Sequence, residues 1–346
     1  MKVLIDISHP AHVHLFKHFI KEMENRGHKM IITARKKEVT EYLLNVYNLE
    51  YQIVSRRRDY QLGWGIEGVE RFENFSRIIR QNKPDIAVTI IDPVISLLSK
   101  INQFPSIHLT DTEHAKLILK TTLPFADTIL TPSSFLLGLG EKQIQYNGYH
   151  ELAYLHPNYF KPDPTVLDEL GLSKGDTFFI LRFVSWTASH DIGQYGIKDQ
   201  TSFVKKLGRY GHVFISSESK LPRTLEKYRI RIPPEKMHDL LYYATLYIGE
   251  GGTTASEAAT LGTHAVHIST TAKYCGVFHE LNRYRLLWFL ENENNAINLI
   301  MQLLQEDDLY KLGKRKRKRL IKDKIDVTKF LIQFVENYPE TSEGVH

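Results

Sequence analysis

Short runs of β-branched and aromatic residues alternate with amphipathic stretches along nearly all of the 346-residue chain, and this alternation strongly constrains the fold. It is typical of parallel sheets whose strands are joined by helices that cover both faces. The strand-like runs form two series, separated by the proline-punctuated segment 156–164, which has neither a strand nor a helix period. We therefore predict an α/β chain with two Rossmann-like, doubly wound parallel-sheet domains facing a cleft.

The predicted domain boundaries follow from these two series. We predict an N-terminal domain over residues 1–150, a linker over 151–164 and a C-terminal domain over 165–324. A final helix is predicted over 325–346, and it could pack against the N-terminal domain. Such folds bind ligands in the crevice outside the carboxyl ends of their strands. Strands are predicted at residues 3–8, 28–34, 50–54, 85–91, 106–111, 127–131 and 144–149, and then at 177–185, 212–218, 227–232, 245–250, 263–269 and 285–290.

The net charge of +5 arises from one basic segment. Residues 311–324 hold nine Lys and Arg residues and one Asp, so the rest of the chain is slightly acidic, which argues against a nucleic-acid footprint over the whole surface. The single cysteine, Cys275, excludes an intramolecular disulfide, and Asp6 interrupts the apolar run that a signal peptide needs. Because no apolar run approaches the roughly 20 residues that span a bilayer, we expect a cytoplasmic protein.

A turn almost free of large side chains lies in GEGGTTASEAATLG, residues 249–262. It joins a predicted strand to an alanine-rich helix, whose first N–H groups and positive dipole end favour an anion. Thr253 and Thr254 can add hydroxyl donors, and Glu257 can accept from vicinal hydroxyls such as those of a ribose. The alternative is that the glycines only make a turn and that Glu257 only faces water, since neither common nucleotide-binding glycine spacing is present.

The region around this turn, residues 232–268, resembles the donor-binding half of GT-B glycosyltransferases. The likeness is most evident to the bacterial transferases that add N-acetylglucosamine to the lipid-linked peptidoglycan precursor. It implies that Glu257 binds the ribose of a nucleoside diphosphate sugar, with a UDP-linked sugar as the expected substrate and no separate cofactor. The residues implied to hold the diphosphate are Gly251, Gly252, Thr253 and Thr254.

Four histidines, His9, His12, His14 and His18, occur in the segment HPAHVHLFKH. His14 and His18 share a predicted helical face, but no nearby carboxylate or cysteine completes a zinc site, so we expect no metal here. PAHVH resembles the first turn of GT-B enzymes, which ends in His-Val, although Pro and Ala replace its glycines. The resemblance implies that His12 is a candidate general base for an acceptor hydroxyl, a role that suits an imidazole with a pKa near 6.5.

Acidic residues follow two neighbouring predicted strands, Asp92 in TIIDP and Asp111 in SIHLTDTEH. The carboxyl ends of adjacent parallel strands lie at one edge of the sheet, so both side chains are expected in the crevice. This layout resembles the non-hydrolysing sugar-nucleotide 2-epimerases, in which an aspartate and a glutamate at these places do the acid/base work. Here Asp111 stands near the glutamate's place, and the Ala-Gly-Leu-Arg continuation is missing.

Candidate cations follow the first strand of the C-terminal domain in LRFVSWTASHDIG, which contains Arg182 and His190. A fixed positive charge there can offset the charge of a departing nucleoside diphosphate. The alternative for Arg182 is that it only forms an ion pair with a nearby acidic residue. His150 and Glu151 lie where the chain crosses between the domains, and they could either contact substrate or pack at the hinge. The Asp-x-Asp pair that holds a divalent ion in other glycosyltransferases is missing, which favours metal-independent chemistry.

The basic segment includes Lys314 to Arg319 and is predicted to be a helix with a solvated face. RNA binding is disfavoured because no aromatic residues are interleaved with the charges. Such clusters are attracted to anionic lipid by about 1 kcal/mol per nearby charge. Peripheral contact with the inner face of the membrane is therefore an open alternative, which would suit an enzyme with a lipid-linked acceptor.

Over nearly its full length the chain resembles an uncharacterised family of predicted GT-B glycosyltransferases that is common in archaea. The stretches that carry this resemblance are ISHPAHVHLFKHFI, GHKMIITARKKE, YNGYHELAYLHPNYFKPD, LRFVSWTASHDIGQYG and GEGGTTASEAATLGTHAV. The implied function is transfer of a sugar from a nucleoside diphosphate sugar to a saccharide or lipid-linked acceptor. The alternatives are a sugar-nucleotide 2-epimerase that uses Asp92, Asp111 and His190, and a non-catalytic sugar-nucleotide-binding partner subunit.

Overall fold

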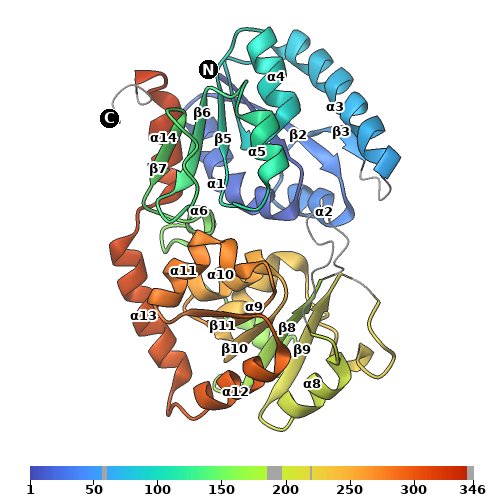
Figure 1. The fold of residues 1–346 in the computed structure, drawn as a ribbon, viewed down its shortest axis with the longest axis vertical. Helices are drawn as coiled ribbons and strands as arrows, with labels where there is room; N and C mark the ends of the chain where they lie inside the picture. The colour runs from blue at the N-terminus through green and yellow to red at the C-terminus, as the bar shows by residue number, and fades with distance from the viewer. Residues whose placement is uncertain (57–60, 185–196, 219, 341–346) are drawn as a thin grey trace. The chain divides into compact units, whose positions relative to one another are not determined.

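The computed structural model describes residues 1–56, 61–184, 197–218 and 220–340, with only the backbone described at 61–64. The chain divides into two compact units, Met1–Tyr154 with Ile325–His346, and Leu155–Lys324. Each unit is built around one sheet of parallel strands with helices packed against it (Figure 1). The predicted class, two doubly wound parallel-sheet α/β domains, is therefore confirmed.

The sheet of the first unit has seven strands in the order β3-β2-β1-β4-β5-β6-β7, and all neighbours run parallel. The direction of winding reverses between β1 and β4, and doubly wound sheets bind ligands outside the carboxyl ends of the strands at such a point. The strands are β1 (Lys2–Ile7), β2 (Lys29–Lys36), β3 (Gln52–Arg56), β4 (Ile86–Ile90), β5 (Ser106–Leu109), β6 (Thr128–Pro132) and β7 (Gln143–Tyr146).

The helices of the first unit pack in two sets. α1 contacts α2 and α14, whereas α3 contacts α4, and α4 contacts α5. Residues 3–7 of β1 are all buried, as expected of a central strand that is covered on both faces. The helices are α1 (Pro10–Asn25), α2 (Glu38–Val46), α3 (Gln61–Asn82), α4 (Pro93–Ile101), α5 (Lys116–Thr122) and α14 (Val327–Glu336), and the short α6 (Leu152–Leu155) ends one residue past the boundary of the unit.

α14 is the last helix of the chain, yet it belongs to the first unit. Its apolar face is buried, the Thr328 hydroxyl donates to the carbonyl of Ala153 at 2.7 Å, and Glu336 pairs with Arg26, the C-cap of α1, at 2.9 Å. Gly148 permits this packing, because a Cβ there would lie 2.6 Å from a methyl carbon of Val327. The first unit is thus closed by residues that follow the whole of the second.

The sheet of the second unit has five parallel strands in the order β12-β11-β10-β8-β9. Its winding reverses between β8 and β10, so the carboxyl ends of these two strands are the matching ligand-binding point. The strands are β8 (Phe178–Phe183), β9 (His212–Ser217), β10 (Leu246–Gly249), β11 (His264–Ile268) and β12 (Leu287–Leu290). The helices are α7 (Thr165–Asp168), α8 (Gln200–Leu207), α9 (Met237–Tyr243), α10 (Gly252–Thr260), α11 (Gly276–Arg283), α12 (Glu293–Leu303) and α13 (Leu309–Asp323), with short 3₁₀ turns η1 (Glu226–Tyr228), η2 (Pro234–Lys236) and η3 (Ala272–Tyr274).

The strand predicted at 227–232 is wrong. This segment forms the end of η1 and then a single bridge between Arg229 and Ile215 of β9. Arg229 donates to the Glu226 carboxylate through two nitrogens at 2.8 Å, which holds the chain in a tight local turn. Two prolines, Pro233 and Pro234, follow directly and supply no N–H groups for a ladder, so pairing stops after one bridge.

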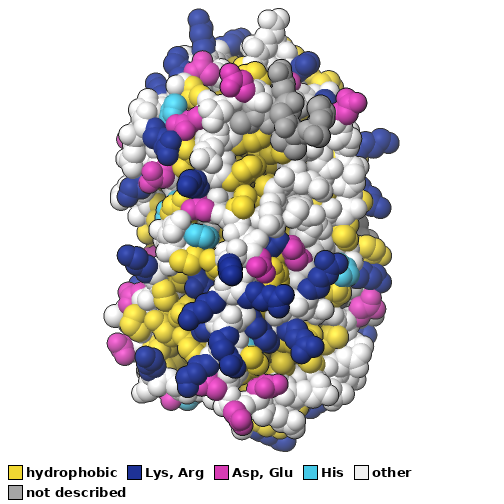
Figure 2. All heavy atoms as spheres, turned by 90° about the vertical axis from the view of Figure 1, so that its left-hand side faces the viewer, with side chains coloured by type: hydrophobic (Ala, Val, Ile, Leu, Met, Phe, Trp, Pro, Cys, Tyr) yellow, Lys and Arg dark blue, Asp and Glu magenta, His cyan; other side chains and the backbone are white. Residues whose placement is uncertain are grey.

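The basic segment forms α13, which runs along the outside of the second unit. Lys and Arg side chains gather over this unit on the face that α13 presents (Figure 2). Among the described residues no helix combines the length and the apolar character that crossing a bilayer requires.

Candidate functional site

The point of reversed winding in the first unit carries two carboxylates. Asp6 lies near the carboxyl end of β1, and Asp92 follows β4 as the N-cap of α4. The Oδ1 atom of Asp92 accepts hydrogen bonds of 2.9 Å from the backbone N–H groups of Val94 and Ile95. Pro93 at the first helical position completes a strong helix start. Asp92 thus has a structural task as well as a place at the predicted site.

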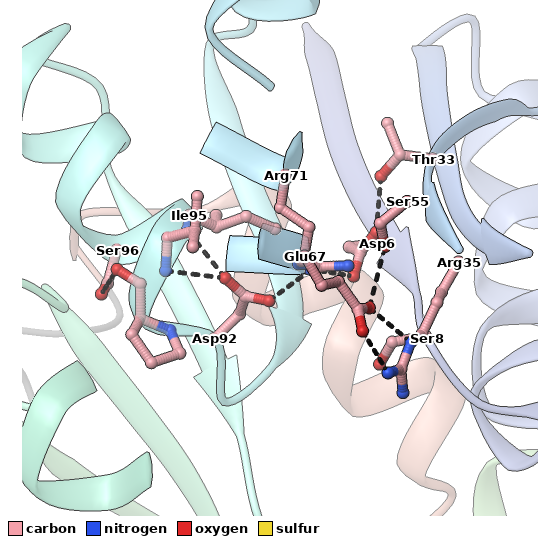
Figure 3. A network of polar contacts seen from close by, with 12 residues as sticks. Asp6, Ser8, Thr33, Arg35, Ser55, Glu67, Arg71, Asp92, Ile95 and Ser96 are labelled. Carbon is pink, nitrogen blue, oxygen red and sulfur yellow. Dashed lines mark hydrogen bonds and ion pairs between the residues drawn. The ribbon is translucent and has the colours of Figure 1, made fainter. Parts of the chain in front are cut away.

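Arg71 of α3 joins these two carboxylates. Its Nη2 atom lies 2.9 Å from Asp6 and 2.5 Å from Asp92, and Thr33 of β2 donates to Asp6 at 2.8 Å (Figure 3). Burial disfavours the charge of Arg71, but Asp6 and Asp92 together raise its pKa above the usual value. Burial also raises the pKa of Asp6, against the opposing charge of Arg71, because the residue is only 1% exposed.

A second ion pair lies one helical turn away on α3. Glu67 accepts a hydrogen bond of 2.6 Å from Arg35 of β2 and another of 3.1 Å from Ser55 of β3. Glu67 and Arg71 are both buried, and Figure 3 shows them pointing toward the ends of the strands. The sequence analysis missed Asp6, Glu67 and Arg71 as site residues. The available signals were a charge inside the apolar run of β1 and an acid-base pair spaced by four residues on α3.

His12 and Asp111 lie close to this network. The Nδ1 atom of His150 is 3.1 Å from Asp111, and the Nδ1 atom of His12 is 3.4 Å from the hydroxyl of Ser8. Burial, followed by the positive charges of His150 and Arg71, lowers the pKa of His12 to about 3. The expectation that its pKa lies near 6.5 is therefore wrong, and the ring is neutral at pH 7.

Asp111 keeps its charge despite its surroundings. Burial alone would raise its pKa, but the charge and hydrogen bond of His150, with a further hydrogen bond from Thr112, hold the pKa at about 2. At neutral pH the group therefore combines an ionised Asp111 with a neutral His12. The imidazole is free of a proton at pH 7 and the charge of Asp111 favours its protonated form, but a pKa of about 3 makes it a weak base.

The other histidines of the amino-terminal cluster have separate surroundings. His9 is the N-cap of α1 and accepts from the N–H of Ala11 at 3.2 Å. His14 is buried against the ring of Tyr154, with ring centroids 5.5 Å apart. Within the described ranges, no group of three or more His, Cys, Asp or Glu side chains has an arrangement suited to a metal ion.

In the second unit, the glycine-rich turn leads from β10 into α10, as predicted. Gly251 is the N-cap of α10 and supplies no side-chain hydrogen bond to the helix start. The N–H groups of the first turn, including those of Gly252, Thr253 and Thr254, have no carbonyl partner within the helix. Thr253 is exposed and Thr254 half-buried, so the start of α10 reaches the surface of the unit.

The glycines of this turn make room for Arg182. A Cβ on Gly251 would lie 2.6 Å from the Cδ atom of Arg182 and 2.7 Å from its Nε atom, and one on Gly249 would overlap the Arg182 carbonyl. The guanidinium itself contacts Ser216 at 2.9 Å and Glu218 at 2.7 Å. The glycines are thus needed because the Arg182 side chain, and not a ligand, packs closely against the turn. This packing brings the guanidinium of Arg182 to the start of α10.

Glu257, one turn into α10, does not face water. It is 6% exposed, and its Oε1 atom lies 3.0 Å from the Nε2 atom of His238, which is 5% exposed on α9. His238 fixes the orientation of the carboxylate, a role that the sequence analysis did not assign. Nothing local in the sequence marks His238, because 19 residues separate the pair.

Glu250 connects the turn to the segment that follows β8. Its two carboxylate oxygens accept from the N–H groups of Ile197 at 2.7 Å and Val184 at 2.9 Å, and the residue is 6% exposed. Both donors flank residues 185–196, and the predicted site residue His190 lies in that stretch, outside the described residues. Glu250 was not among the predicted site residues, although it stands between two of the glycines.

The structure divides the basic residues Lys314 to Arg319 into two groups. Lys314 donates to the carbonyls of Tyr242 and Leu261 at 2.7 and 2.9 Å, and Arg317 donates to that of Thr260 at 3.1 Å. Lys316 likewise contacts His264 at 2.9 Å. The expectation that the whole segment is a solvated or lipid-facing surface is therefore wrong for these three side chains. Arg315, Lys318 and Arg319 are exposed.

Comparison with known proteins assigns the chain to a family. Residues 1–340 match the model of DUF354, a family described as proteins of unknown function. The chain belongs to this family. It is also 26% identical over 328 residues to the uncharacterized protein MJ0665 of Methanocaldococcus jannaschii, covering 91% of this chain and 93% of that one. The predicted membership in an uncharacterised family is thus confirmed.

Solved structures with the same fold include UDP-N-acetylglucosamine 2-epimerases and glycosyltransferases. The S. aureus MnaA–UDP co-structure has a TM-score of 0.72 at 13% identity, covering 98% of this chain and 97% of that one. UDP-GlcNAc 2-epimerase from Neisseria meningitidis, bound to UDP-GlcNAc, has a TM-score of 0.64 at 14% identity, covering 96% and 99%. The spinosyn rhamnosyltransferase SpnG, complexed with spinosyn aglycone, has a TM-score of 0.63 at 13% identity, covering 97% and 100%. This DUF354 protein therefore has the GT-B fold, which by itself fixes neither reaction nor substrate.

Proposed function

We propose that this DUF354 protein binds a nucleoside diphosphate sugar on its second unit, with the diphosphate at the start of α10. The observation that carries the proposal is the side chain of Arg182 lying against Gly251, where α10 begins without a side-chain cap. The Arg182 guanidinium, whose charge Glu218 partly offsets at 2.7 Å, acts there on an anion together with the first N–H groups of α10 and its positive dipole end. Thr253 and Thr254 add hydroxyl groups at the same turn.

The ribose is assigned to Glu257. A carboxylate that accepts from two vicinal hydroxyls must be held in one orientation, and the contact with His238 at 3.0 Å provides this. Because the residue is almost fully buried, a charge-assisted hydrogen bond from a ribose gains from the low local dielectric. In this proposal Gly251 and Gly252 bind the ligand through their backbone N–H groups. The space left by the missing Cβ of Gly251 is filled by the side chain of Arg182.

We further propose that the protein is a glycosyltransferase that acts without a metal ion. The neutral His12 ring can accept the proton of an acceptor hydroxyl, and the carboxylates of Asp111 and Asp92 favour the imidazolium that forms. Asp92 acts through its charge and not as the base, because both its oxygens already accept hydrogen bonds. Arg182 offsets the charge of the leaving diphosphate. The acceptor is a saccharide or a lipid-linked saccharide.

The donor site is tested by calorimetric titration of UDP and UDP-GlcNAc into the wild type and Glu257→Gln. Loss of charge-assisted hydrogen bonds to the ribose should weaken binding about tenfold or more. Glu306→Gln, which removes an exposed carboxylate on the same unit, is the matched control and should bind as the wild type does. Equal affinity of the wild type and Glu257→Gln would refute the ribose assignment.

A sugar-nucleotide 2-epimerase is the second candidate. The ionised Asp111 next to His150 provides a carboxylate of the kind that removing a proton at C2 requires, while His190, also assigned to this reaction, lies outside the described residues. Incubation of UDP-GlcNAc in deuterated water without any acceptor separates the two reactions. An epimerase incorporates deuterium at C2 and forms the C2 epimer, whereas a transferase leaves that carbon unchanged.

A further inference from the structure

A small pocket lies on the second unit between α9 and α13, apart from the start of α10. It has a volume of about 220 Å³ and is lined by Pro157, Tyr242, Lys314, Arg317, Lys318 and Ile321. Three of the six lining residues are basic and none is acidic. The volume is below the roughly 300 Å³ at which sites for drug-sized ligands begin, so the pocket suits a small charged group and not a whole nucleotide.

Two of these basic side chains, Lys314 and Arg317, are held firmly in place. Lys314 donates to the carbonyls of Tyr242 and Leu261, and its Nζ atom lies 3.7 Å from the centroid of the Tyr242 ring. Arg317 donates through Nε to Thr260 at 3.1 Å and through Nη2 to Leu155 at 2.9 Å. Their positions are therefore set before any ligand arrives, which lowers the entropy cost of binding.

The charge balance at the pocket is positive even after these contacts. Thr260 and Leu261 end α10, whose last carbonyls carry about half a negative charge in total. Arg317 and Lys318 bring two positive charges to the pocket, whereas burial and the charge of Arg317 lower the pKa of Lys314 to about 6, so its side chain is mostly neutral at pH 7. The whole of α13 has eight Lys and Arg residues against one Asp, and Figure 2 shows the basic side chains gathered on this face. The field at the pocket therefore attracts an anion.

We propose that the pocket formed by Tyr242, Lys314, Arg317 and Lys318 binds a phosphate group. The phosphate is carried either by a free phosphorylated molecule or by the headgroup of an anionic lipid, since the same cations serve both. Ile321 and Pro157 provide apolar surface beside the charges, and a phosphomonoester with a carbon chain uses both parts of the wall. This site is separate from the proposed donor site and does not depend on it.

The test compares two exposed lysines of α13. Lys318 lines the pocket, whereas Lys322, one turn further along the helix, does not. Lys318→Glu and Lys322→Glu change the net charge equally, and neither removes a buried contact. Wild type and both variants are titrated with inorganic phosphate by calorimetry. They are also sedimented with vesicles of phosphatidylcholine alone and of equal parts phosphatidylcholine and phosphatidic acid.

We expect the Lys318→Glu exchange to weaken binding about tenfold or more, because each charge near an anion contributes about 1 kcal/mol. The Lys322→Glu variant should stay within about twofold of the wild type. Saturable binding of inorganic phosphate with this pattern supports a free phosphorylated ligand. If the same difference between the two variants is seen with phosphatidic acid vesicles but not with inorganic phosphate, the ligand is a lipid headgroup.

Equal losses in the two variants would mean that α13 attracts anions only through its diffuse charge, and the pocket proposal would fail. Binding that survives the Lys318→Glu exchange would place phosphate elsewhere, for example at the start of α10, and would also overturn it. Absence of binding to both probes would do the same. None of these outcomes bears on binding of UDP at α10, which Glu257→Gln tests independently.

Discussion

At the scale of single residues, Arg71 is a buried cation of the first unit that pairs with two carboxylates. It is 8% exposed and is the shared partner of Asp6 and Asp92. Arg71→Met should lower the free energy of unfolding by about 3–5 kcal/mol, because it leaves two carboxylates without their cation. Denaturant unfolding measures this loss. Arg77→Met, which removes an exposed arginine from the same helix, should change stability by less than about 0.5 kcal/mol, and equal effects of the two would contradict the account.

Lys314 should make stability depend on pH. Burial and the charge of Arg317 lower its pKa from the ordinary 10.5 to about 6. Between these values the unfolded chain binds the proton and the folded one does not, so stability rises with pH and falls as the pH drops toward 6. The slope from this group is at most about 1.4 kcal/mol per pH unit.

The comparison of wild type with Lys314→Met isolates this slope. Denaturant unfolding at several pH values from 6.5 to 9 should give a flatter profile in the variant, since methionine binds no proton. Parallel profiles would show that Lys314 keeps its proton in the folded protein. The variant is expected to be less stable throughout, as two carbonyls lose their donor.

At the scale of elements, the turn between β10 and α10 couples Gly251 to Arg182. In Gly251→Ala the new methyl group would lie 2.6 Å from the Cδ atom of Arg182, so the arginine must move. We expect a loss of about 1–3 kcal/mol in stability together with weaker binding of UDP. Arg182→Ala removes the clash, so the stability cost of Gly251→Ala should nearly vanish in that background. Strictly additive losses in a double-mutant cycle would rule out this packing explanation.

The sequence predicted most of the helices and strands but not which side chains contact one another. The turn at 249–262 was placed correctly between strand and helix, whereas its glycines were attributed to a ligand and not to the side chain of Arg182. An acid-base pair spaced by four residues, such as Glu67 and Arg71, is ordinarily a solvated pair. Only the fold reveals that both point inward, because their partners lie on β1, β2 and β3 and at the N-cap of α4.

The prediction for the basic helix was wrong for the same reason, because the sequence does not show which groups its side chains face. Its charge density predicted a solvated surface, yet Lys314, Lys316 and Arg317 donate to carbonyls or to His264 within the second unit. Long basic side chains can reach polar groups past the apolar ridge of a helix. Sequence periodicity does not distinguish a lysine that ends on a carbonyl from one that ends in water.

At the scale of the whole molecule, the chain leaves the first unit once and returns to it with α14. The buried face of α14 includes Val327, Leu331 and Val335, all less than 1% exposed. A chain that ends at Lys324 should therefore expose the matching face of α1 and unfold the first unit at a lower temperature. Calorimetry of the truncated and full-length chains should show this loss, while Glu336→Gln, which removes only the partly exposed pairs with Arg26 and His28, should shift the transition little.

The central claim is that a nucleoside diphosphate sugar binds at the start of α10. The most direct measurement is amide hydrogen exchange of the full-length protein with and without UDP-GlcNAc, read peptide by peptide. We predict slower exchange in residues 249–262 on addition of the ligand, and no such slowing in Glu257→Gln at the same concentration. Unchanged exchange across 249–262 under saturating ligand, with protection in another part of the chain, would contradict the account.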